Sequence, residues 1–133
     1  MSRASGIFEV KLVPQPKDEY ADGATLGRMT IDKQFRGDLI GASRGQMLTA
    51  VAAVKGSAGY VAVELVDGTL GGRAGTFVLQ HSGTMNRGTA SLTLSVVPDS
   101  GTGELTGLSG AMQIIIADGT HSYEFDYTLA RSS

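Results

Sequence analysis

Glu64 and His81 are the residues in this sequence best suited to acid–base chemistry. Glu64 lies in a predicted strand whose other face is apolar. If its carboxylate reaches a cavity and has a raised pKa there, it can act as a general base. Histidine changes its charge near neutral pH and is the side chain most often used to move protons. The alternative for Glu64 is an exposed cross-strand ion pair with Arg73, worth about a few tenths of a kcal/mol. Glu64 and His81 are therefore candidate catalytic residues.

A second group of candidates, expected to bind a ligand, is mainly aromatic: Tyr123, Tyr127, His121 and Phe77. The first three alternate along one face of a predicted strand. Two phenol hydroxyls and an imidazole beside an apolar face are the few convergent polar groups that a small-molecule pocket needs. The alternative for His121 is a partly buried structural residue at the rim of a barrel. Phe77 is expected to share an inward face with His81.

Lys33 and Ser43 fall in patterns that we interpret without assigning a site. Lys33 lies on the apolar face of its strand and is expected to extend its ammonium group into solvent at a barrel end. Ser43 occupies the serine position of a Gly-x-Ser-x-Gly string, and His121 follows in the chain order of α/β-hydrolases. That motif requires a helix after the serine and a parallel sheet, and the chain has no run of strand–helix units. A hydrolase is not expected.

The composition excludes several classes of function. The chain has 133 residues, no cysteine, 11 Lys plus Arg and 13 Asp plus Glu. Without cysteine there is no disulfide, thiolate metal site or cysteine nucleophile, and two histidines without a carboxylate pattern do not indicate a metal site. No basic cluster is available for nucleic-acid phosphates, and no apolar run is long enough for a signal peptide or a membrane span. We expect a cytoplasmic protein with no metal, cofactor, nucleic-acid partner or membrane partner.

Period-two alternation of apolar and polar residues predicts the strands that would position these side chains. The alternating segments cover residues 8–12, 29–36, 91–96 and 124–129. Residues 45–54 contain several alanines and fit a strand or a helix, and the flanking glycines favour the strand. Each alternating segment has one apolar and one polar face, which is typical of an antiparallel sheet with one side in water.

Two Asp-Gly pairs predict hairpins with type I′ turns. The Asp118-Gly119 turn pairs the following residues on one aromatic and aliphatic face: Ile116 with His121, Ile114 with Tyr123, Met112 with Phe125 and Gly110 with Tyr127. The Asp67-Gly68 turn places Val63 and Leu65 on the inward face. On that register Phe77 would face water, so we expect a bulge at Gly71-Gly72 or Gly75 that returns Phe77 and His81 to the inside.

The glycine content indicates how these strands are arranged. The chain has 19 glycines, and the pattern gives eight or nine strands separated by short turns. A sheet of that size must curl, split or close, and glycines within strands permit the coiling that closure requires. We predict an all-β fold with one domain over residues 1–133, a single antiparallel eight-stranded β-barrel, with a sandwich as the alternative. Residues 14–22 form the longest irregular connection and the one lid candidate.

Several segments resemble known families. Residues 99–110, Asp-Ser-Gly-Thr-Gly-Glu-Leu-Thr-Gly-Leu-Ser-Gly, resemble the glycine-rich segment of the allene oxide cyclase and dirigent barrels. Residues 60–64, residues 71–77, His81-x-Gly83 and Gly119-x-His121-x-Tyr123 resemble a family of uncharacterised bacterial proteins with that fold, over about residues 35–129. The resemblance implies a calycin-like barrel with a cavity. It carries over no cyclase chemistry, because no catalytic residue can be matched to each role.

Together these features predict a barrel that binds a small lipophilic molecule in a mostly apolar cavity. One alternative is an isomerase- or cyclase-type enzyme in which Glu64 or His81 moves a proton. Another is a non-catalytic module whose outer strand faces form a homo-oligomer. Whether Glu64 and His81 face the interior of the barrel is the observation that would best distinguish these three functions.

Overall fold

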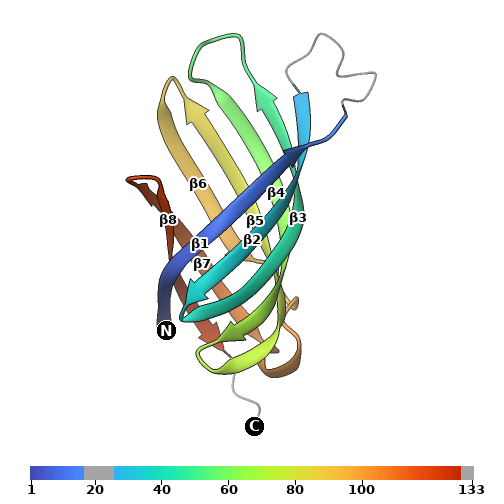
Figure 1. The fold of residues 1–133 in the computed structure, drawn as a ribbon, viewed down its shortest axis with the longest axis vertical. Helices are drawn as coiled ribbons and strands as arrows, with labels where there is room; N and C mark the ends of the chain where they lie inside the picture. The colour runs from blue at the N-terminus through green and yellow to red at the C-terminus, as the bar shows by residue number, and fades with distance from the viewer. Residues whose placement is uncertain (17–25, 130–133) are drawn as a thin grey trace.

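The computed structural model describes residues 1–16 and 26–129. Within them the chain forms a closed antiparallel barrel in which each strand pairs with the next and β1 pairs with β8 (Figure 1). The strands are β1 (Ser2–Pro14), β2 (Leu26–Gly37), β3 (Leu39–Val51), β4 (Ala58–Leu70), β5 (Arg73–Asn86), β6 (Thr89–Val96), β7 (Leu108–Ala117) and β8 (Thr120–Leu129). The predicted all-β, eight-stranded antiparallel barrel is confirmed. Of the lid candidate, residues 17–22 lie outside the described residues.

The β7–β8 hairpin has the predicted register. Ile116 pairs with His121, and the register continues through Tyr123 and Phe125 to Tyr127 opposite Gly110. Asp118 and Gly119 form the turn, both with positive φ (52° and 76°), as a type I′ turn requires. Turn chemistry and hydrophobic pattern agree in this hairpin, and local sequence is sufficient to set its register.

The β4–β5 hairpin differs from the prediction. Asp67 and Gly68 lie inside β4, where Gly68 pairs with Gly75, and the turn is Gly71-Gly72 with φ of 56° and 84°. No bulge is needed, because β4 has the opposite phase to the predicted one. Its even-numbered residues, Glu64 among them, point into the barrel, and the predicted inward residues Val63 and Leu65 are half exposed on the outside.

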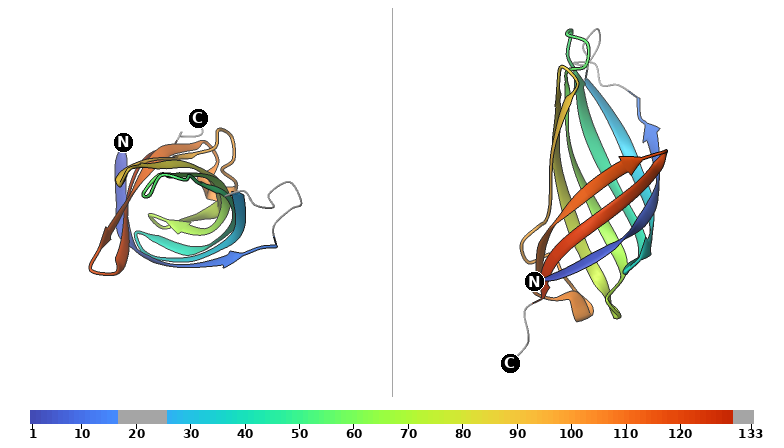
Figure 2. Two further views of the ribbon diagram at one scale, coloured as in Figure 1. Left: turned by 90° about the horizontal axis from the view of Figure 1, so that it is seen from above. Right: turned by 90° about the vertical axis from the view of Figure 1, so that its left-hand side faces the viewer.

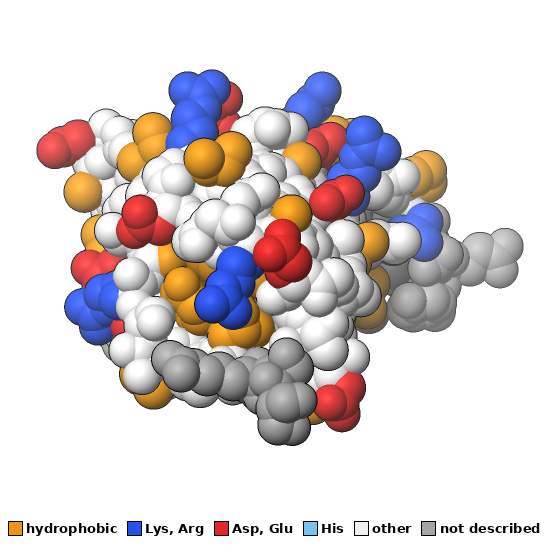
Figure 3. Space-filling model, turned by 90° about the horizontal axis from the view of Figure 1, so that it is seen from below, with side chains coloured by type: hydrophobic (Ala, Val, Ile, Leu, Met, Phe, Trp, Pro, Cys, Tyr) orange, Lys and Arg blue, Asp and Glu red, His pale blue; other side chains and the backbone are white. Residues whose placement is uncertain are grey.

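The core fills the lower end of the barrel, where the β2–β3 and β4–β5 turns lie. The side chains of Leu39, Phe77 and Phe125 are completely buried there, and the two phenylalanine rings stack with centroids 5.9 Å apart. A 3₁₀ helix (Gly103–Leu105) between β6 and β7 adds the fully buried Leu105. Charged side chains of both signs are interspersed over this lower end (Figure 3). The barrel is therefore closed at its lower end by packed apolar side chains.

Strands β6 and β7 have the shortest pairing in the barrel. The structure pairs β6 with β7 only through Ser95 and Ala111, and above that point the two strands diverge (Figure 2). The upper part of the barrel wall is formed by β2 to β6, which carry the β3–β4 and β5–β6 connections at their upper ends.

Candidate functional site

Four polar side chains meet inside the barrel, midway along its axis. They are the buried polar or charged residues of the described chain: Lys33 on β2, Ser43 on β3, Glu64 on β4 and His81 on β5, each at most 5% exposed. Neighbouring strands present every second residue to the interior, so four adjacent strands can place one polar residue each at a common level. The predicted inward position of His81 is confirmed.

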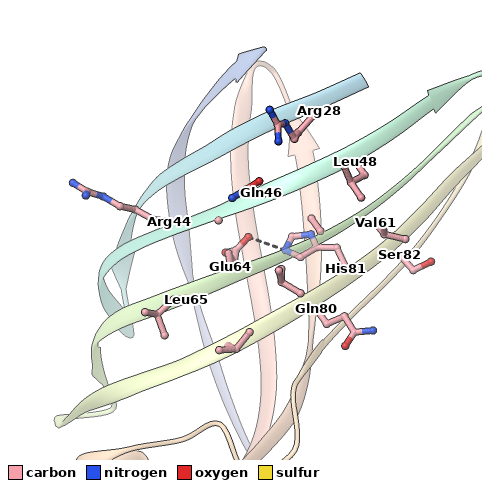
Figure 4. A pocket seen from close by; sticks show the side chains of 14 residues that line it. Arg28, Arg44, Gln46, Leu48, Val61, Glu64, Leu65, Gln80, His81 and Ser82 are labelled. Atoms are coloured by element: carbon pink, nitrogen blue, oxygen red, sulfur yellow. Dashed lines mark hydrogen bonds and ion pairs between the residues drawn. The ribbon is translucent and has the colours of Figure 1, made fainter. Parts of the chain in front are cut away.

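Glu64 is the centre of this cluster. Its Oε2 atom accepts hydrogen bonds from Lys33 Nζ at 2.9 Å and from His81 Nε2 at 2.7 Å, and its Oε1 atom accepts one from Ser43 Oγ at 3.2 Å. Figure 4 shows the Glu64–His81 contact as a dashed line. Among the described residues, no buried side-chain nitrogen or oxygen lacks a partner. The cluster is a fully connected polar network in an apolar interior.

The electrostatics keep Glu64 ionised. Burial alone would raise its pKa, but the hydrogen bond from His81 and the positive charge of Lys33 outweigh that effect, and the pKa of the Glu64 carboxyl lies below its ordinary value. The prediction that Glu64 has a raised pKa, as a general base would need, is therefore wrong. The predicted ion pair of Glu64 with Arg73 is also wrong, because Arg73 lies beside the β4–β5 turn opposite Leu70.

Lys33 does not reach solvent, in contrast to the prediction. Its ammonium group lies 4.9 Å from the centre of the Phe8 ring and 5.8 Å from that of Phe35, in addition to its bond to Glu64. Cation–π contacts and one carboxylate replace the water that a lysine at a barrel end would have kept. Lys33 and Glu64 thus neutralise each other inside the barrel.

Tyr60 connects the cluster to the upper end. Its hydroxyl lies 3.3 Å from His81 Nδ1, on the side of the imidazole away from Glu64. Burial raises the pKa of the Tyr60 phenol, and the negative charge of Glu64 adds to this, so the hydroxyl keeps its proton at neutral pH. Sequence reasoning missed Tyr60 as a site residue; it shares the even-numbered face of β4 with Glu64, and the correct phase of that strand would have identified it.

An apolar pocket of about 410 Å³ opens above the cluster, with Tyr60 as part of its wall. Three of its lining residues are methionines: Met29, Met47 and Met85. The rest of the wall consists of Thr49, Ala50, Val51, Ala58, Gly59, Gly83, Thr84, Ala90, Ser91 and Leu92. No described lining residue carries a charge. A concave, mostly apolar site with few polar groups is the usual form of a small-molecule pocket.

A groove of about 950 Å³ lies on the outer surface of β3 to β5. Its floor includes Leu48, Val61, Val63 and Leu65, each about half exposed (54%, 51%, 51% and 51%). In Figure 4, Arg28, Arg44 and Gln46 from β2 and β3 lie along one side of the groove, and Gln80 and Ser82 from β5 along the other. The homo-oligomer expected from the sequence stays a prediction.

The four predicted ligand-binding residues lie apart from the upper pocket. Phe77 stacks on Phe125 in the lower core. The Tyr127 ring packs against the Phe125 ring, with the two ring centres 5.4 Å apart. The Tyr123 hydroxyl accepts a hydrogen bond from the backbone N–H of Leu39 at 2.9 Å, which ties β8 to the start of β3. His121 is partly buried with its ring 5.3 Å from that of Phe8. Their role in binding stays a prediction.

Three further observations concern Ser43, metal ligands and membrane-spanning helices. Ser43 bonds to Glu64 and not to a histidine, so the arrangement differs from a serine–histidine pair. In the parts of the chain that the structure covers, no three His, Asp or Glu side chains gather as a metal site would require. No helix there has the length and apolar character needed to cross a bilayer.

Comparisons with known proteins place the chain in context. The sequence profile of a family described as "Protein of unknown function (DUF3224)" matches residues 4–127. A crystal structure of a protein of unknown function from that family, from Shewanella oneidensis MR-1, is 52% identical, with a TM-score of 0.93 and coverage of 99% of each chain. No curated protein matches the sequence.

Proposed function

The chain belongs to the DUF3224 family of proteins of unknown function, and we propose that it binds a small, mostly apolar molecule in the pocket at the upper end of the barrel. The observation that carries this proposal is the pocket of about 410 Å³ directly above a buried polar network. Its size lies within the usual range for small-molecule sites. Three methionines in its wall favour an apolar ligand, since thioether side chains adapt to irregular apolar shapes.

Filling the pocket tests this proposal. Ala58 lines it on β4, so Ala58→Trp places an indole in the space that the ligand would occupy. Ser82 lies on the exposed outer face of β5, and Ser82→Trp adds the same group outside the barrel as a control. We expect saturable binding of the neutral dye Nile red, measured by fluorescence titration, in the native protein and in Ser82→Trp but not in Ala58→Trp. Equal binding in both variants, or no saturable binding, would contradict the proposal.

A second candidate function is an isomerase-type enzyme, favoured by the chain of contacts from Tyr60 through His81 to Glu64. Such a chain can take up a proton at the phenol oxygen and store its positive charge on an imidazole held by a carboxylate. Incubation with 2-decanone in D₂O tests this function, because proton transfer at carbon exchanges the α-hydrogens for deuterium. Mass spectrometry would detect faster exchange with the native protein than with Tyr60→Phe, and equal exchange rates would reject the enzyme hypothesis.

Three finer expectations from the sequence remain proposals: the kinship with allene oxide cyclase-like, calycin-like barrels, a bacterial source and a cytoplasmic location.

A further inference from the structure

Resting on the proposed function, we infer that the pocket selects an uncharged apolar molecule that carries a hydroxyl group, and that this hydroxyl donates a hydrogen bond to the Tyr60 oxygen. Three properties of the described residues favour such a ligand: the charge balance of the buried cluster, the direction of its hydrogen bonds, and the small number of polar groups in the pocket wall.

The charge balance excludes a charged ligand group. The carboxylate of Glu64 is neutralised by Lys33 at 2.9 Å, and both side chains are buried. No described residue that lines the pocket carries a charge. A carboxylate or ammonium group at the inner end of the pocket would lose its water without gaining a counter-charge, which is strongly unfavourable. The polar group of the ligand is therefore neutral.

The hydrogen bonds have a definite direction. Glu64 can only accept, so His81 Nε2 must carry the proton of their 2.7 Å contact. With this one proton on the ring, the Nδ1 atom has a free lone pair and accepts. Tyr60 then donates its one hydroxyl proton to Nδ1 at 3.3 Å. The tautomer follows from these partners.

This direction leaves Tyr60 with lone pairs and no free proton. A ligand that meets it must therefore bring a donor. An alcohol has one, whereas an ether or ketone oxygen has only lone pairs and would face another acceptor. Thr49, which pairs with Tyr60 across β3 and β4 and whose side chain lies beside Gly27, supplies a second hydroxyl to the pocket. Removing the Thr49 hydroxyl separates its contribution from that of Tyr60.

A matched set of ligands tests the inference by displacement of Nile red at pH 8: decan-1-ol, its methyl ether, 2-decanone and decanoate. We expect decan-1-ol to bind about three- to tenfold more tightly than the ether or the ketone, as one additional net hydrogen bond provides. Decanoate is expected to bind most weakly. Equal affinities for alcohol and ether, or preference for decanoate, would overturn the inference and leave the proposed function intact. Failure of the whole series to bind would contradict the proposed function itself.

Two variants assign the effect to its residue. Tyr60→Phe should remove the preference for the alcohol and leave the affinity for the ether unchanged, whereas Thr49→Val should keep the preference. Loss of the preference only in Thr49→Val would overturn the inference. Nitrogen-15 NMR of the His81 ring gives an independent test in the native protein. A neutral ring protonated at Nε2 at pH 8 agrees with the inference, and an imidazolium contradicts it.

Discussion

Glu64 is a buried carboxylate whose stability depends on three partners acting together. Lys33, His81 and Ser43 supply its hydrogen bonds, and Lys33 also supplies the compensating charge. The removal of two ions from water costs several kcal/mol each, and their mutual attraction recovers this only when geometry and hydrogen bonding are good. Each charge in this pair therefore depends on the other, and loss of one partner is expected to cost more than loss of both.

Substitution of Glu64 alone, and of Lys33 and Glu64 together, tests this dependence. Glu64→Ala leaves the Lys33 charge buried without a carboxylate and should lower the free energy of unfolding by about 3–5 kcal/mol. Lys33→Met together with Glu64→Gln removes both charges at similar volume and should be more stable than Glu64→Ala. Urea denaturation followed by circular dichroism compares both variants with the native protein.

The exposed pair Arg3–Asp126, 2.7 Å apart, serves as the control. Solvent screens this pair, so Asp126→Asn is expected to change stability little. An equal loss from Glu64→Ala and Asp126→Asn would show that Lys33 and Glu64 are not coupled in the folded protein.

The elements differ in how far local sequence determines them. The β7–β8 hairpin was predictable because an Asp-Gly turn and an alternating pattern specify the same register. In the β4–β5 hairpin the Asp67-Gly68 pair offers the same local chemistry as Gly71-Gly72, and contacts with β3 decide between them. Gly68 pairs with Gly41 across β3 and β4, where a Cβ atom on Gly68 would overlap the backbone oxygen of Ile40. Gly68 is thus required by a close approach between strands, which pattern reasoning cannot detect.

This distinction predicts the relative cost of two glycine substitutions. Gly72 has φ of 84° and nothing near its missing Cβ, so Gly72→Ala should cost about 1–2 kcal/mol of backbone strain. Gly68→Ala introduces a methyl group against the backbone of β3 and should cost more, because neither strand can move without breaking its ladder. Thermal unfolding monitored by circular dichroism compares the two. A larger loss for Gly72→Ala would contradict the role assigned to Gly68.

At the scale of the whole molecule, the order and register of neighbouring strands create the candidate site. Lys33, Ser43, Glu64 and His81 come together from β2, β3, β4 and β5, which are consecutive in the sheet. The sequence identified Glu64 and His81 by their chemistry, but the role of Lys33 depended on the phase of β4 and on which strands are neighbours. The apolar pocket was expected from the aromatic face of β8, whereas it lies above the cluster and between the upper parts of β2 to β6. Strand stagger, which sets these levels, is a property of the closed barrel.

The buried cluster links β2, β3, β4 and β5, and its protonation should therefore affect the stability of the entire barrel. The pKa of Glu64 in the folded protein lies below the ordinary value of 4.5. A carboxyl group with a depressed folded-state pKa binds fewer protons when folded than when unfolded. Its stabilising contribution is therefore fully present above the unfolded-state pKa, and it is lost as the pH falls through the folded-state pKa.

Comparison with Glu64→Gln isolates this contribution, because glutamine does not titrate and the variant keeps every other acidic group. One of these is Asp126, whose pKa is also lowered by its bond to Arg3. Measured by urea denaturation from about pH 3 to about pH 8, the native protein should exceed the variant in stability by a constant amount from neutral pH down to about pH 5. The two curves should converge as the solution is acidified below that range. A gap that widened on acidification would mean that Glu64 is protonated more readily in the folded state. That result would reverse the charge assignment from which the neutral imidazole and the hydroxyl-bearing ligand were inferred.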